Sequence, residues 1–304
     1  MSRTGAQAGL SLRRAGGSLS LLAAAVIWGF SYVVAAAAAR RTDALFLTFY
    51  RYVLAAAGML AAVWLCKIRI SGTVLRKSWL LGLLLSMSQY IQVSAAGYST
   101  PGKISFITAA YVVWVPPLEA VFERKRLTLR SVGLSLLTLL ALSLLYDLRG
   151  AVNRGDVLAV FGSLGFAAHI LCSERALQTQ PAEPLAAMQF AWGAIFSGAL
   201  LLLKEGTLRL EQTDTQLWLE IGYLGAFSTL AGFLLQMHGQ RRVPAGTASI
   251  LLSTEAVFGL LFSVLAGKET LTVKSMISFA LISCAVWLTQ TKKNKDERVY
   301  EVKK

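Results

Sequence analysis

Long apolar stretches alternate with short polar connectors along almost the whole chain. A transmembrane helix needs about 20 apolar residues to cross a hydrocarbon core of about 30 Å. Measured against that length, the sequence predicts ten spans, and the connectors between them are too short to fold as a soluble domain. The predicted spans are 19–39, 44–66, 79–99, 104–122, 128–146, 157–174, 184–203, 216–237, 245–266 and 271–290. The pattern therefore predicts an all-α polytopic membrane protein.

The first apolar stretch has a second interpretation. Arg13 and Arg14 precede the run LSLLAAAVIWGF, and small residues follow it, which is an order also found in cleaved signal peptides. The apolar run continues to Ala39, however, and is long enough to span a membrane. We therefore expect a retained helix here.

Composition supports a membrane protein. The chain is 55% hydrophobic and 15% charged, with a mean hydropathy of +0.58, whereas soluble domains carry about 25% charged residues. The cysteines stand far apart and without histidine neighbours at ligand spacing, so neither a disulfide framework nor a metal site is predicted. They are Cys66, Cys172 and Cys284.

The net charge of +14 is explained by orientation in the membrane. With ten spans and a cytoplasmic N-terminus, 20 of the 30 Lys and Arg residues face the cytoplasm and nine face the opposite side. This bias follows the positive-inside rule and favours contact with anionic lipids at the cytoplasmic face. A nucleic-acid partner is not needed to explain the charge. Both termini are expected in the cytoplasm.

The two halves of the chain show weak internal similarity. FYRYVLAA in the first half aligns with AMQFAWGA in the second, which places Arg51 opposite Gln189. Five spans in each half put the second half into the membrane upside down, an inverted repeat typical of secondary transporters. We expect repeats at 18–147 and 155–290, with cytoplasmic tails at 1–17 and 291–304. The sequence does not determine the oligomeric state, and a homodimer is one of the states it allows.

Several segments resemble the EamA-type branch of the drug/metabolite transporter superfamily. They are AAVIWGFSYV, FYRYVLAA, GYSTPGKISFITAAYVVWVPPLEAVFERKRLT and AFSTLAGFLLQMHGQRRVPAGTASILLSTEAVFGLLFSVLAGKETLT. The resemblance covers residues 18–290. It implies a ten-helix carrier of small metabolites, commonly an exporter in a bacterial inner membrane. One departure is that Lys125 stands in the first half where Glu269 stands in the second.

Two charged residues lie inside predicted spans. Glu255 is costly in lipid and should face the protein interior. It either hydrogen-bonds backbone unwound near Pro244 and Gly246, or binds a proton or the ammonium group of a substrate. Arg51 either holds a substrate carboxylate, or reaches the interface from the end of its helix as a structural charge.

Further polar and aromatic residues in the spans are candidates for a substrate pocket. As a set they favour an amphipathic solute such as an amino acid, because a polyanion would need more basic residues than Arg51. The candidates are Trp28, Tyr32, Gln89, Tyr90, Tyr111, Trp114 and His169, together with Glu255.

The sequence lacks the common catalytic, cofactor-binding and metal-binding motifs. The sequence has no HExxH, GxSxG or GxxxxGK[ST] motif, so no catalytic residue, cofactor or metal ligand is predicted. The predicted function is a secondary transporter that exports small amphipathic metabolites such as amino acids or related compounds. The alternative is an intramembrane enzyme acting on a lipid or peptide, since folding can bring a serine and a histidine together.

Overall fold

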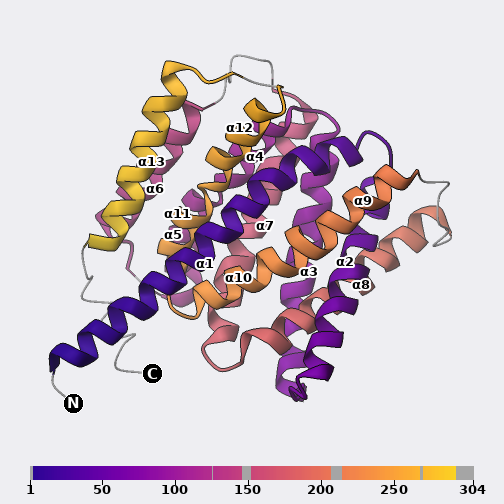
Figure 1. Ribbon diagram of the computed structural model, residues 1–304, viewed down its shortest axis with the longest axis horizontal. Helices are drawn as coiled ribbons and strands as arrows, with labels where there is room; N and C mark the ends of the chain where they lie inside the picture. Colours follow the sequence, from indigo (N-terminus) through magenta and orange to yellow (C-terminus); the bar gives the residue numbers. More distant parts are fainter. Residues whose placement is uncertain (1–2, 125, 146–151, 207–213, 268–269, 292–304) are drawn as a thin grey trace.

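The computed structural model describes residues 3–124, 126–145, 152–206, 214–267 and 270–291, and all regular structure in these residues is helical. Figure 1 shows that the helices pack side by side as a bundle. One element, η1, is a π-helix. The elements are α1 (Arg3–Ala38), α2 (Ala44–Leu65), α3 (Gly72–Ala96), α4 (Pro101–Ala109), α5 (Tyr111–Glu123), α6 (Leu129–Ser143), α7 (Arg154–Leu177), α8 (Ala182–Glu205), α9 (Thr215–Tyr223), η1 (Leu224–Ala231), α10 (Gly232–Gln240), α11 (Ala245–Leu252), α12 (Glu255–Leu265) and α13 (Val273–Thr291).

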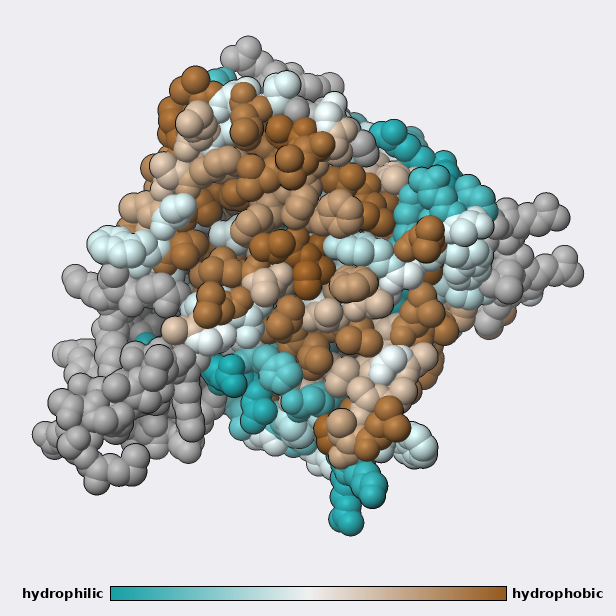
Figure 2. Space-filling model, in the orientation of Figure 1, coloured by the Kyte–Doolittle hydropathy of each residue, from teal (hydrophilic) through white to brown (hydrophobic). Residues whose placement is uncertain are grey.

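Seven helical segments in the described residues are long and apolar enough to cross a membrane. Helices α6 and α13 are apolar but shorter, and α3 is long enough but contains Gln89 and Gln92, which lower its hydropathy. Apolar side chains cover much of the surface in Figure 2. The chain is therefore a multi-pass membrane protein. The seven segments are Arg14–Ala38, Ala44–Leu65, Pro101–Phe122, Arg154–Leu177, Ala182–Glu205, Thr215–Gln240 and Ala245–Leu265.

Three of these segments are interrupted near their middle. A break at Ala110 separates α4 from α5, and a break at Ser253 and Thr254 separates α11 from α12. In the third, α9 and α10 are joined through the π-helix η1. Irregular backbone at membrane depth is tolerated where protein buries it or where it lines a cavity. The interruptions therefore indicate where a binding site can lie.

Helices from the first half of the chain pack against helices from the second half. Helix α8 contacts both α2 and α3, α7 contacts α3, and α1 contacts α10 and α12. Helices α6 and α13 pair at one edge of the bundle, as Figure 1 shows. Large side chains such as Tyr52 and Phe190 are fully buried between α2 and α8. This packing leaves a cavity inside the bundle, lined by residues from most of the helices.

Candidate functional site

A cavity of about 720 Å³, including its part open to solvent, lies at the centre of the bundle. Its lining residues come from α1, α2, α3, α4, α5, α7, η1, α10, α11 and α12. Its lining is mostly apolar with a few polar side chains, which is the usual composition of small-molecule sites. Most of the residues predicted from the sequence line the cavity, namely Trp28, Tyr32, Arg51, Gln89, Tyr111, His169 and Glu255.

The structure does not bring two of the predicted residues to this cavity. Tyr90 is half-buried and is not part of the cavity wall. Trp114 is 37% exposed, and its Nε1 donates a hydrogen bond of 3.1 Å to Ser163 Oγ. Trp114 thus joins α5 to α7 and faces outward. Lys125 and Glu269, the pair in which the sequence departs from the family pattern, lie outside the described residues.

Glu255 lies at the point where α12 begins, directly after the break in the helix, and only 3% of it is exposed. Tyr32 of α1 and Tyr111 of α5 bring their hydroxyl groups next to its carboxylate. Within the described residues, Glu255 Oε1 and the Tyr111 hydroxyl still lack a hydrogen bond of good geometry. No described backbone N–H donates to this carboxylate, so the unwound backbone is not its partner. Glu255 lines the central cavity, and its Oε1 is a buried acceptor without a described partner.

Gln89 and Gln92 add polar groups to the same region of the wall. Gln92 Nε2 donates to the Tyr32 hydroxyl at 3.2 Å and to Thr108 Oγ1 at 3.3 Å. Gln89 is 3% exposed, and its Oε1 is a further buried acceptor without a partner in the described chain. Buried polar groups are normally hydrogen-bonded. Unused acceptors at Gln89 and Glu255 therefore indicate a place for a ligand with N–H or O–H donors.

Arg51 lies in α2 and is 2% exposed, so it does not reach the interface. Its Nε donates to Thr229 Oγ1 at 2.9 Å and its Nη2 to Ser228 Oγ at 3.0 Å. Both hydroxyls belong to η1. The sequence predicted Arg51 as a site residue, but it did not predict the π-helix. The eight residues that form this element, LGAFSTLA, carry no signal that distinguishes them from an ordinary apolar helix.

The indole of Trp28 forms the apolar floor between these polar groups. Its Nε1 donates to the Ser228 carbonyl oxygen at 2.9 Å, and its ring lies 4.7 Å from that of Phe233. Gly232 makes this position possible, since a Cβ there would lie 2.4 Å from Trp28 Nε1. The cavity thus offers aromatic surface bounded by polar atoms, which suits an amphipathic molecule.

His169 contacts both Gln189 and Ser173. Its Nε2 lies 3.1 Å from Gln189 Oε1 and 3.3 Å from Ser173 Oγ. Ser173 is fully buried and does not line the cavity. This serine–histidine contact therefore presents no nucleophile to a molecule bound there, and the described residues contain no group of three His, Cys, Asp or Glu that could hold a metal ion.

The chain is similar over most of its length to two proteins that are named as uncharacterized transporters. A transporter of Archaeoglobus fulgidus named "Uncharacterized transporter" is 25% identical over 275 residues, which cover 90% of this chain and 86% of that protein. "Uncharacterized transporter YwfM" of Bacillus subtilis strain 168 is 28% identical over 276 residues, covering 87% of this chain and 90% of that one.

A solved structure described as "Crystal structure of protein" shares the fold. Its TM-score is 0.74 at 19% sequence identity, over 90% of this chain and 96% of that one. The profile of the EamA-like transporter family matches residues 15–147 and again residues 153–291. The chain therefore belongs to the EamA-like transporter family.

Proposed function

We propose that this protein is a secondary transporter that exports small amphipathic metabolites, such as amino acids or related compounds. The observation that carries the proposal is the central cavity. Its wall draws on both family-matched segments, and it combines aromatic surface with Arg51, Glu255 and unused hydrogen-bond acceptors. Transporter sites of this kind lie between repeats at mid-membrane depth. Alternating access then exposes the cavity to one side of the membrane at a time.

The proposed topology is ten spans in two inverted five-helix repeats, 18–147 and 155–290. Helices α3, α6 and α13 complete the count beside the seven long apolar segments. The proposed location is a bacterial inner membrane with both termini in the cytoplasm, as the 20-to-9 charge bias favours. Reporter fusions after Lys77 and Arg242 should then report cytoplasm, and fusions after Gly102 and Gly206 the opposite side. A cytoplasmic signal after Gly206 would contradict the inverted repeat.

Transport itself is tested with the purified chain in proteoliposomes. Radiolabelled amino acids and their amines are offered without nucleotide or cofactor, and the solute is recovered and identified after uptake. Saturable movement of an unchanged solute, absent from protein-free liposomes, is the expected result. Chemical turnover of a lipid or peptide with no flux would instead support the intramembrane enzyme.

A further inference from the structure

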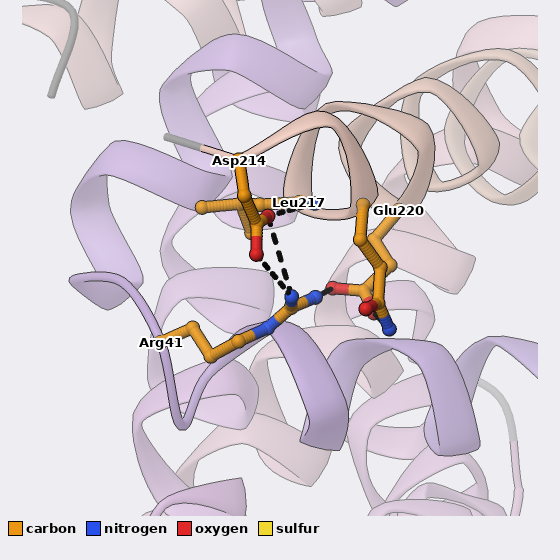
Figure 3. A network of polar contacts seen from close by, with 5 residues as sticks. Arg41, Asp214, Leu217 and Glu220 are labelled. Atoms are coloured by element: carbon orange, nitrogen blue, oxygen red, sulfur yellow. Dashed lines mark hydrogen bonds and ion pairs between the residues drawn. The ribbon is translucent and has the colours of Figure 1, made fainter. Parts of the chain in front are cut away.

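Arg51 is the one fully buried lysine or arginine in the described residues, and its partners differ from those of two more exposed basic residues, Arg41 and Lys103. Arg41, shown in Figure 3, donates to Asp214 Oδ2 at 3.1 Å and also pairs with Glu220. Lys103 pairs with Asp156 at 2.7 Å. Arg51 contacts only the neutral hydroxyls of Ser228 and Thr229, and no carboxylate of the described chain lies within ion-pair distance of it.

An uncompensated charge in this position is costly. Charged groups within membrane spans normally pair with one another or face a pathway for substrate or ions. Arg51 lines the central cavity, and its Nη1 makes no hydrogen bond to a described residue. A planar guanidinium with a free edge matches a carboxylate better than it matches water or a hydroxyl.

The π-helix η1 holds the guanidinium in this orientation. The Thr229 hydroxyl donates to the carbonyl of Leu224, five residues earlier, at 2.8 Å and accepts from Arg51. The Ser228 carbonyl accepts from the Trp28 indole, and Ser228 Oγ accepts from Arg51 Nη2 at 3.0 Å and donates to no described residue. Its hydroxyl hydrogen is then available to a ligand that lies against Arg51. π-Helices occur often at functional sites.

We propose that Arg51 and the Ser228 hydroxyl form a binding site for the carboxylate of the transported solute, an inference that rests on the proposed transport function. The solute carries one carboxylate, because one guanidinium supplies one charge. Its donor groups face Gln89 and Glu255, two residues of the same cavity wall that each hold a buried oxygen without a described partner. The site therefore selects amphipathic monocarboxylates and rejects analogues whose carboxylate is masked.

The test compares acids with their amides on the purified full chain. L-Leucine, L-phenylalanine and L-methionine are each titrated beside the α-amide, which keeps the side chain and the ammonium group but lacks the carboxylate. Thermal unfolding reports binding, since a ligand of the folded state raises the Tm. At least one acid should bind the wild type at least about tenfold more tightly than its amide, the factor expected for a charge-assisted hydrogen bond.

Arg51→Gln should bind that acid and its amide alike, and Arg41→Gln, the matched control outside the cavity, should keep the preference. Ser228→Ala keeps the charge and should reduce the preference by about two- to tenfold, which tests the site even if Arg51→Gln fails to fold. An amide bound as tightly as its acid, an unchanged preference in Arg51→Gln, or no binding of any acid would overturn the site. Acids that bind through Arg51 but are not moved across proteoliposomes would keep the site and reject transport. Equal flux of acids and amides would keep transport and reject the site.

Discussion

Gly29 lies where α1 crosses α12, and an alanine there is expected to force the two helices apart. A Cβ at Gly29 would lie 2.5 Å from Phe258 Cβ and 2.8 Å from the Gly259 backbone nitrogen. Packed carbon atoms sit about 3.5–4.0 Å apart, so relief requires a movement of roughly 1 Å, and backbone atoms cannot rotate away. Overpacking of this kind costs about 1–3 kcal/mol, or roughly 2–10 °C in Tm.

The assay is thermal unfolding of purified Gly29→Ala, followed by intrinsic tryptophan fluorescence in detergent. Gly133→Ala is the matched control, because a Cβ at Gly133 meets no atom within 4 Å and the residue is exposed on α6. The control should match the wild type or gain up to about 1 kcal/mol from helix propensity. If both variants unfold at the same temperature, the close approach of α1 and α12 is not as described.

Two further changes test single side chains. Glu255→Gln keeps the size of the residue but removes its charge. It should weaken the binding of ammonium-bearing solutes, measured by Tm-based titration, by more than about 1.5 kcal/mol. Unchanged binding together with a changed Tm would show that the role of Glu255 is structural. Burial raises the pKa of Asp43, but hydrogen bonds from Lys204 and the Leu45 N–H outweigh this effect and hold the pKa below its ordinary value. The charged Asp43 therefore stabilises the folded chain above about pH 4, and this stabilisation is lost as the pH falls further. Asp43→Asn keeps a residue type suited to the N-cap of α2. At pH 7 the variant should be less stable than the wild type by under about 1 kcal/mol. If the same difference in stability persists at about pH 3, the Asp43–Lys204 ion pair is not its cause.

The helices could be located from the sequence because lipid demands long apolar segments. The cavity residues could be chosen for a related reason, since polar groups within such segments are expensive unless they face the interior. Trp28, Gln89 and Glu255 were found in this way. Arg51 was found too, although its position near the start of α2 also suggested that it could reach the interface, and the structure shows it buried.

The sequence could not determine which way neighbouring side chains point. Tyr90 follows Gln89, and successive residues on an α-helix point about 100° apart, so only Gln89 lines the cavity. A span that is apolar on all sides gives no periodicity from which to choose the face. The π-helix that contains Ser228 and Thr229 was also not predicted, because its sequence LGAFSTLA resembles that of an ordinary apolar helix.

The central claim is that one cavity opens in turn to the two sides of the membrane. Ser31 lines this cavity, whereas Ser197 is fully buried away from it. Each is replaced by cysteine in a chain whose three native cysteines are changed to alanine, and a membrane-impermeant maleimide is applied to right-side-out and to inside-out vesicles. The account predicts that Ser31→Cys reacts from both sides, more slowly when a transported solute is present, and that Ser197→Cys reacts from neither. Reaction of Ser31→Cys from one side only, in protein that still transports, would contradict it.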